Sequence, residues 1–113
     1  GEAWCLNMLQ YLALETSKVH SYQIDLPKTE GVIRFWNAIS DRNKMITPKP
    51  GHWVLWDMGN GKGHCGIIRQ IISTNMITIE GNTASEKEEG VFMKSRSLAN
   101  KKVLGFIKVF HTN

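Results

Sequence analysis

The hydrophobic periodicity of this chain changes once, at the segment spanning residues 47–51, and this change limits the possible folds more than any other feature. Before the segment, apolar residues recur every three to four positions, as on one face of a helix. After it they alternate or run continuously, as in strands. Pro48 and Pro50 end any helix that reaches them. Helices followed by strands are typical of an α+β fold, with the helices packed on an antiparallel sheet.

Two helices are predicted before this segment, one over residues 2–16 and one over about 30–40. Each has four apolar residues at i, i+3, i+4 and i+7, the spacing of one helix face. These stripes are Cys5, Met8, Leu9 and Leu12 in the first helix, and Val32, Phe35, Trp36 and Ile39 in the second. Thr29 is a candidate N-cap of the second helix, because a threonine hydroxyl can accept a hydrogen bond from the free N–H groups of a first turn.

Five strands are predicted after the segment, separated by a glycine-rich loop at 57–63, a tight turn at 73–75 and a polar, acidic loop at 83–89. The predicted strands are residues 53–56, 64–72, 76–82, 90–96 and 103–109. We therefore expect a single α+β domain over residues 1–113, with N-terminal helices packed on an antiparallel sheet of five to six strands.

The composition excludes several classes of protein. With 42% hydrophobic and 21% charged residues, the chain is neither disordered nor collagenous nor a coiled coil. No apolar run approaches the roughly 18 residues of a membrane span, and no signal peptide opens the chain. The net charge of +4 favours anionic partners such as nucleic acid, acidic lipid or bacterial wall polymers without choosing among them, or it serves solubility alone.

The chain has two cysteines, Cys5 and Cys65, which are too few for a disulfide framework. No CxxC or HExxH spacing indicates a metal site, so we expect no metal and no cofactor. Cys5 lies in the first turn of the first predicted helix, where the helix dipole and free N–H groups lower the pKa of a thiol. It is therefore a candidate nucleophile, although a lone cysteine is more often a small buried hydrophobic residue.

The predicted hairpin of the second and third strands offers a base for this nucleophile. Thr78, Glu80 and Asn82 share one face of the third strand. If the turn centres near Ser73, His64 lies across from Asn82 and diagonal to Glu80, within side-chain reach of both. A histidine beside a carboxylate and an amide is the second half of a nucleophile–base–orienter arrangement. The alternatives are a structural imidazole at a strand end and a solvated carboxylate.

Four short segments carry a resemblance to a known family. They are Ala3-Trp4-Cys5-Leu6, Pro48-Lys49-Pro50-Gly51-His52-Trp53-Val54-Leu55-Trp56, Gly63-His64-Cys65-Gly66-Ile67-Ile68 and Ile79-Glu80-Gly81-Asn82-Thr83. In this order and spacing they resemble the CHAP family, the cysteine- and histidine-dependent amidohydrolases/peptidases of the wider NlpC/P60, papain-like group. Residues 90–92 and 103–107 resemble its last strands, so the resemblance covers nearly the whole chain. It implies a papain-like NlpC/P60 fold and a hydrolase that cleaves peptidoglycan, as in phage endolysins, virion lysins, bacterial autolysins or secreted antibacterial effectors.

Carried over residue by residue, the resemblance implies a role for each candidate. Cys5 matches the nucleophile, His64 the base and Glu80 the acidic residue that orients the histidine. Asn82 matches the polar residue often found two positions later. Cys65 stands where the family usually has an aliphatic residue, which implies a packing role.

Two tryptophans and a second histidine complete the set of candidates. Trp4 and Trp56 are the candidates for substrate contact, since aromatic rings can stack on sugars, although packing in the core is an equally open alternative for Trp56. His52 stands where the family commonly has aspartate, a position that is more often structural than catalytic. The chain has no Asp-rich calcium loop like those of some family members, so the resemblance implies no metal.

The resulting hypothesis is a cysteine amidohydrolase or peptidase that cleaves the N-acetylmuramoyl–L-alanine amide or a peptide bond of the stem or cross-bridge. Two alternatives stay open: a non-catalytic cell-wall or glycan-binding module on the same scaffold, and a thiol amidohydrolase with a non-wall substrate. We expect peptidoglycan as the partner, an immunity or inhibitor protein as a candidate second partner, and no nucleic acid. A monomer is expected, acting at the bacterial cell wall after secretion, from a virion or on release at lysis.

Overall fold

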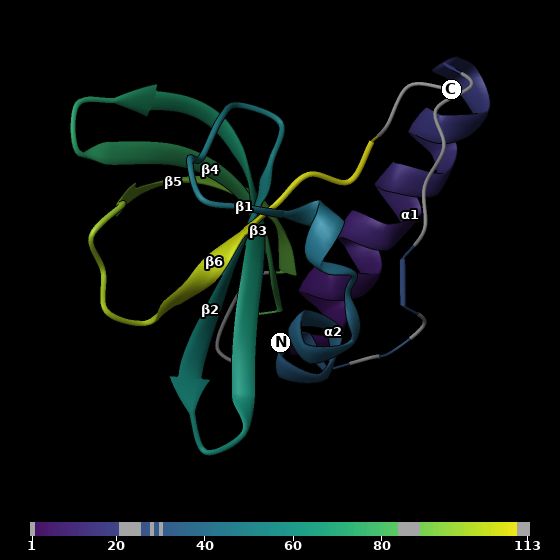
Figure 1. The fold of residues 1–113 in the computed structure, drawn as a ribbon, viewed down its shortest axis with the longest axis horizontal. Helices are drawn as coiled ribbons and strands as arrows, with labels where there is room; N and C mark the ends of the chain where they lie inside the picture. The colour runs from purple at the N-terminus through teal and green to yellow at the C-terminus, as the bar shows by residue number, and fades with distance from the viewer. Residues whose placement is uncertain (1, 21–25, 28, 30, 84–88, 111–113) are drawn as a thin grey trace.

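The computed structural model describes residues 2–20, 26–27, 29, 31–83 and 89–110. Helices α1 (Glu2–His20) and α2 (Val32–Ala38) precede all the strands (Figure 1). A 3-10 turn, η1 (Asp41–Asn43), follows α2. The strands are β1 (Lys44–Met45), β2 (Trp53–Gly59), β3 (Lys62–Ile72), β4 (Asn75–Thr83), β5 (Glu89–Ser97) and β6 (Val103–Ile107).

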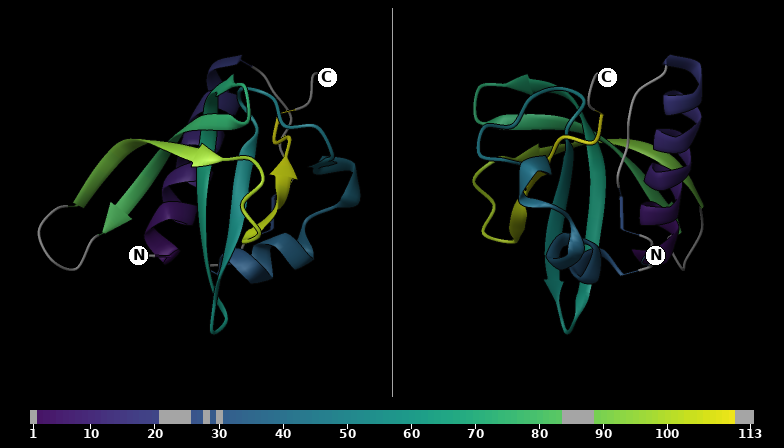
Figure 2. Two further views of the ribbon diagram at one scale, coloured as in Figure 1. Left: turned by 90° about the vertical axis from the view of Figure 1, so that its left-hand side faces the viewer. Right: turned by 45° about the vertical axis from the view of Figure 1, so that its right-hand side comes forward.

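The six strands form one antiparallel sheet in the order β1-β6-β2-β3-β4-β5. Both helices lie on the same side of this sheet (Figure 2). The buried residues that they share with the strands are Cys5, Leu6, Leu9, Ala13, Val32, Phe35, Ile39, Trp53, Leu55, Cys65, Ile107 and Val109. The predicted α+β architecture, with two N-terminal helices packed on an antiparallel sheet, is therefore confirmed.

A second apolar cluster lies on the other face of the sheet. Its buried members are Val54, Trp56, Ile68 and Met76, and partly buried residues of β3, β6 and the segment before β6 pack against them. Residues from β2, β3, β4 and β6 meet in this cluster because the sheet curls (Figure 1). No helical residue within the described parts of the chain belongs to it.

The helices differ from the prediction in three details. α1 ends at His20 rather than at residue 16. Leu12, which the sequence places on the buried stripe, is 41% exposed, whereas Leu6 and Ala13 are buried in its place. Thr29 is not the N-cap of α2, because that helix begins after Gly31 and has no side-chain cap. The angle at which each helix meets the sheet decides which residues are buried, and the periodicity alone does not contain that angle.

Helix α2 has no side-chain cap at its N-terminus, and its position is fixed by close packing on the sheet. A Cβ added to Gly63 of β3 would lie 2.7 Å from Cβ of Val32, at the start of the helix. A Cβ added to Gly105 of β6 would lie 2.5 Å from the ring of Trp36. Glycine at these two strand positions lets the helix approach the sheet closely.

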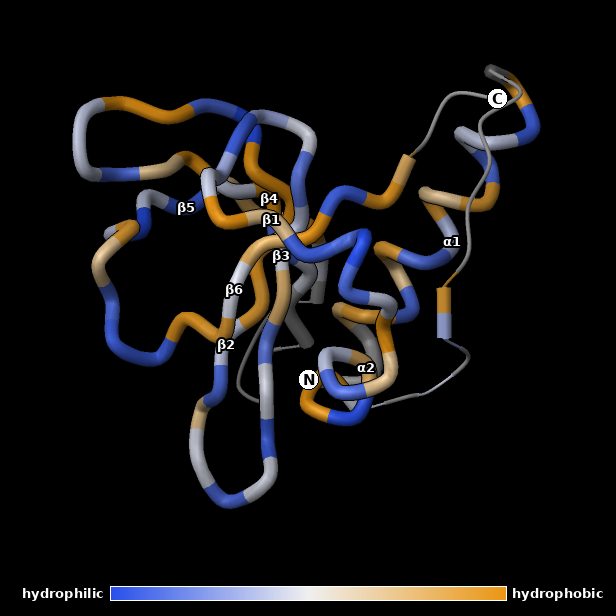
Figure 3. Tube along the Cα trace, in the orientation of Figure 1, coloured by the Kyte–Doolittle hydropathy of each residue, from blue (hydrophilic) through white to orange (hydrophobic). Residues whose placement is uncertain are grey.

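Strands β2 to β5 extend beyond their predicted limits, whereas β6 ends at Ile107 instead of at residue 109, and β1 was not predicted at all. The predicted loop 57–63 is a tight turn, in which Gly59, Asn60 and Gly61 have φ angles of 90°, 57° and 75°. Polar residues around the turn continue the strands instead of ending them, and the tip of this hairpin is hydrophilic (Figure 3). β1 has only two residues, too few for any alternating pattern.

Candidate active site

The candidate nucleophile Cys5 lies where two hairpins of the sheet separate. It is the fourth residue of α1, so the prediction of a position near the helix start is confirmed. The described pairing of β3 with β4 runs from Ile72 and Asn75 only as far as Ile67 and Ile79. Beyond that point β3 stays paired with β2, and β4 stays paired with β5. The first turn of α1 lies beside this opening (Figure 2).

A β-bulge at Arg69 brings Glu80 to the same face as His64. At the turn, the register of β3 and β4 pairs Ile72 with Asn75, and after the bulge it pairs Ile68 with Thr78. A shift by one residue moves every following side chain to the opposite face of the sheet. Without the extra residue, Glu80 would therefore point away from His64.

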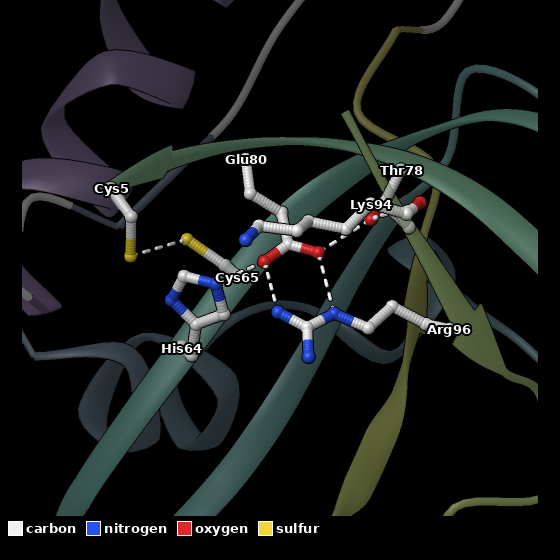
Figure 4. A network of polar contacts seen from close by, with 7 residues as sticks. All are labelled: Cys5, His64, Cys65, Thr78, Glu80, Lys94 and Arg96. Atoms are coloured by element: carbon white, nitrogen blue, oxygen red, sulfur yellow. Dashed lines mark hydrogen bonds and ion pairs between the residues drawn. The ribbon is translucent and has the colours of Figure 1, made fainter. Parts of the chain in front are cut away.

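The side chains of the site form a row of alternating charge, Cys5, His64, Glu80 and Arg96 (Figure 4). His64 Nε2 and Glu80 Oε1 are 2.6 Å apart. Arg96 donates from Nη2 to Oε1 of Glu80 at 2.6 Å and from Nε to Oε2 at 2.9 Å, a bidentate pair. Thr78 donates its hydroxyl to the same carboxylate. The predicted pairing of His64 with Glu80 is confirmed.

Trp56 packs against two members of the row. Its ring is stacked on the His64 imidazole, with centroids 5.4 Å apart and planes at 22°. The Arg96 guanidinium lies over the same indole, 5.4 Å from the ring centroid. Trp56 is 3% exposed, so it restrains both rotamers from within the second apolar cluster. Its expected contact with substrate stays a prediction.

Cys65 is a partner of Cys5 as well as a buried residue. The two sulfur atoms are 3.2 Å apart, and the Cys65 thiol donates to Cys5. Neither cysteine is in a disulfide, and both are 0% exposed. Cys65 and His64 are neighbours on β3 whose side chains leave the strand on opposite sides. Cys5 therefore has one hydrogen bond with Cys65 and one with His64, whose side chains lie on opposite sides of β3.

These contacts reverse the usual order of the two pKa values. The hydrogen bond from Cys65, together with the hydrogen bond and charge of His64, outweighs burial and lowers the pKa of Cys5 from 9.0 to about 5. Burial by itself would lower the pKa of His64, but the bonds to Cys5 and Glu80 raise it to about 9. At neutral pH the proton therefore resides on the imidazole, and the site contains a thiolate–imidazolium pair.

Glu80 stays ionised although it is 2% exposed. Burial favours its neutral form, but hydrogen bonds from Arg96, His64 and Thr78 lower the pKa of Glu80 to about 2. The four charges of the row alternate in sign and sum to zero, which is the condition under which buried charges are tolerated.

The second histidine is outside this row. The backbone of His52 pairs with Ile68, four residues along β3 from His64, or roughly 13 Å at strand spacing. Its Nδ1 accepts a hydrogen bond of 3.1 Å from the Lys49 backbone N–H. Burial and the nearby Lys108 and Lys49 lower the pKa of His52. These contacts agree with the structural role implied by the resemblance.

Two of the candidate side chains lie outside the described part of the structure. Trp4 belongs to α1 and Asn82 to β4, but the positions of their side chains are not described. Their roles therefore stay predictions.

Arg96 is a member of the row that the sequence did not single out as a candidate. Arg96 pairs with Met76 across β4 and β5, so it shares a face with Thr78 and Glu80. Only the register of β4 and β5 could have revealed it, and the predicted polar loop 83–89 contains no turn motif from which a register could be predicted. Residues 84–88 of that loop lie outside the described residues. The role of Cys65 was missed because its partner is on a distant element.

Comparisons with protein-family models, curated proteins and solved structures find no match to this chain. Within the described residues, no group of three or more His, Cys, Asp or Glu side chains is arranged to hold a metal ion. The same residues include no helix long and apolar enough to cross a membrane.

Proposed function

We propose that this protein is a cysteine hydrolase that cleaves an amide bond in peptidoglycan, with Cys5 as nucleophile and His64 as acid and base. The observation that carries the proposal is the row of Cys5, His64, Glu80 and Arg96, in which the thiol has a lower pKa than the imidazole. A pair that is already ionised at neutral pH is what a thiol nucleophile requires.

The proposed fold assignment is the papain-like NlpC/P60 group, and within it the CHAP family. The support is the position of the cysteine near the start of the first helix, with the histidine and the carboxylate on adjacent strands of an antiparallel sheet. The four motifs that resemble the family coincide with these positions. The wall substrate follows from that resemblance, and the net charge of +4 is compatible with anionic wall polymers without selecting them over other anionic partners.

In the first half of the reaction, the Cys5 thiolate attacks the carbonyl carbon of the substrate. Glu80 occupies Nε2 of His64, which leaves Nδ1 to face the sulfur. His64 transfers its proton to the leaving amine, and a thioester forms. The backbone N–H of Cys5, near the start of α1, is the candidate donor to the oxyanion in this proposal.

In the second half, His64 takes a proton from water, which attacks the thioester and releases the acid. Glu80 stabilises the imidazolium in both halves, and the bidentate contact with Arg96 fixes the carboxylate. Cys5 has no exposed surface, whereas the side chain of His64 is 23% exposed. In this proposal the substrate therefore approaches along the imidazole.

The proposal is tested by digesting purified sacculi of several wall types and analysing the released muropeptides by mass spectrometry. The wild type is expected to give products of amide hydrolysis, and their masses identify the bond. Glycan strands freed of peptide indicate the muramoyl amide, whereas shortened or uncrosslinked stems indicate a peptide bond. Cys5→Ala should lose several orders of magnitude of activity, as knockouts of catalytic units do.

His52→Asp is the matched control, because the described contacts of His52 are with Lys49 and Ile68 and not with the row. It should keep its activity, since an aspartate oxygen can accept the same Lys49 N–H bond. Wild-type protein that binds sacculi but releases nothing would contradict the proposal in favour of a wall-binding module. If the wild type neither binds nor cleaves sacculi but cleaves other amides through Cys5, the substrate is not the wall.

A further inference from the structure

The contact between Cys5 and Cys65 goes beyond what an amide hydrolase needs. Hydrolysis requires one sulfur, a base and an orienting group, and the row already contains them. The second thiol stands 3.2 Å from the first, whereas a disulfide has a length of about 2.05 Å. The sulfurs therefore need to approach by only about 1.2 Å to form a bond.

We propose that Cys5 and Cys65 form a reversible disulfide when a hydroperoxide oxidises Cys5, and that this modification switches off the thiolate. The geometry supplies both partners, an attacking sulfur beside His64 and a resolving thiol in contact with it. This inference needs the contact of the two sulfurs and the neighbouring His64, so it does not depend on the identity of the hydrolysed substrate.

The first chemical step is oxidation of Cys5. Its thiolate attacks one oxygen of the peroxide, forming an S–O bond while the O–O bond breaks. The leaving hydroxide takes the proton of the His64 imidazolium and departs as water. A sulfenic acid is left on Cys5, and the peroxide has gained two electrons.

The second step closes the disulfide. The Cys65 sulfur attacks the Cys5 sulfur, the S–S bond forms and the S–O bond breaks. The thiol proton and the departing hydroxide leave as a second water. The two cysteines have together lost two electrons, and a dithiol reductant restores them by exchange.

Burial determines which oxidant and which product are expected. Both cysteines are 0% exposed, so a small neutral oxidant such as hydrogen peroxide fits the site better than a bulky disulfide. The same burial disfavours a bond between two molecules. Contact with Cys65 should also trap the sulfenic acid before further peroxide converts it to sulfinic acid, which thiols cannot reduce.

The test is oxidation of the purified protein with hydrogen peroxide near neutral pH, followed by blocking of free thiols and mass analysis. The wild type is expected to lose two hydrogens, to give one peptide pair linking Cys5 to Cys65, and to return to two thiols with dithiothreitol. Cys65→Ser should instead gain oxygen at Cys5, because no resolving thiol is present. Cys5→Ser should leave Cys65 largely reduced under the same conditions.

The wild-type result decides the inference even if a variant does not fold. A Cys5 that carries two or three oxygens beside a free Cys65 would overturn it, and so would a disulfide between molecules. The readout needs no substrate, so it is distinct from a failure of the proposed function. A wild type that forms the disulfide but digests no sacculi would support the inference and contradict the hydrolase.

Discussion

At the scale of single residues, the site depends on four charges of alternating sign rather than on any one perturbed group. Glu80 is the pivot, because it contacts both His64 and Arg96 and is 2% exposed. Its carboxylate holds the imidazolium, and the imidazolium holds the Cys5 thiolate. A substitution of Glu80 should therefore change the pKa of Cys5, although no hydrogen bond joins the two residues in the described contacts.

Replacing Glu80 with glutamine should raise the pKa of Cys5 and lower that of His64. A neutral amide no longer stabilises the imidazolium by charge, and charge-assisted hydrogen bonds are about twice as strong as neutral ones. The acid limb of Cys5 alkylation should move to higher pH, and hydrolysis should fall by about tenfold or more. Rates of alkylation by iodoacetamide across pH measure this limb.

Asn82→Ala provides the comparison, since an amide can only orient the ring or bond an oxyanion. It should cost less activity than Glu80→Gln. The opposite order, with the alkylation limb unmoved in Glu80→Gln, would make Asn82 the orienting residue of a Cys-His-Asn site.

Cys5, His64 and Glu80 could be selected from the sequence because helix position and strand alternation are local properties. Arg96 and the Cys65 thiol could not be selected, because their contacts depend on how β5 and α1 meet β3 and β4. These two residues change the chemistry: one anchors the carboxylate, and the other contacts the nucleophile.

At the scale of secondary-structure elements, the site requires a close approach of β3 and β4. A Cβ added to Gly66 would lie 2.8 Å from Glu80 Cγ and 3.1 Å from the Ile79 carbonyl oxygen. Only glycine leaves room for the buried carboxylate to cross toward His64. The bulge at Arg69 then sets the face on which that carboxylate lies.

Gly66→Ala should therefore displace Glu80, slow the alkylation of Cys5 near neutral pH and destabilise the protein by about 1–3 kcal/mol. Gly90→Ala is the matched control in β5, because the nearest atom to its added Cβ is at 3.7 Å, an ordinary contact. Chemical denaturation and alkylation rates measure the two effects. Equal behaviour of the two variants would contradict the role of Gly66.

The types of the elements could be predicted from the sequence, but the irregularity in β3 could not. The helix and strand types followed from periodicity, and the turn at Ser73 was correctly located. The sequence pattern contains no sign of the bulge, and the predicted pairing of His64 with Glu80 assumed a turn centred on one residue. The structure reaches the same face with a two-residue turn and one extra residue at position 69.

At the scale of the whole molecule, the sheet separates two apolar clusters, and the charged row lies where its hairpins diverge. The α+β class could be predicted because it depends only on the order of helices and strands along the chain. The strand order β1-β6-β2-β3-β4-β5 could not, because it depends on which strands pair in space. β6 inserts between β1 and β2, a long-range pairing that no local pattern records.

The depressed pKa of Glu80 should appear in the pH dependence of folding stability. Its ordinary pKa of 4.5 falls to about 2 in the folded protein, so the unfolded chain binds the proton more readily. The stabilisation that the Glu80 carboxylate contributes is fully present above a pH of about 4.5, and it is lost as the pH falls through about 2. The difference in the free energy of unfolding between the wild type and Glu80→Gln should shrink across that window. A difference that stays constant would contradict the ionised state of Glu80.

The most direct test of the central claim is the titration of the Cys5 thiolate by its ultraviolet absorbance, taken as the difference between the wild type and Cys5→Ala. The thiolate–imidazolium pair predicts a midpoint for Cys5 of about 5, far below its ordinary value of 9.0. His64→Ala should move this midpoint upward, because the hydrogen bond and the charge of the imidazolium are lost. A Cys5 that titrates near 9.0 in the wild type, or a midpoint unchanged in His64→Ala, would contradict the account.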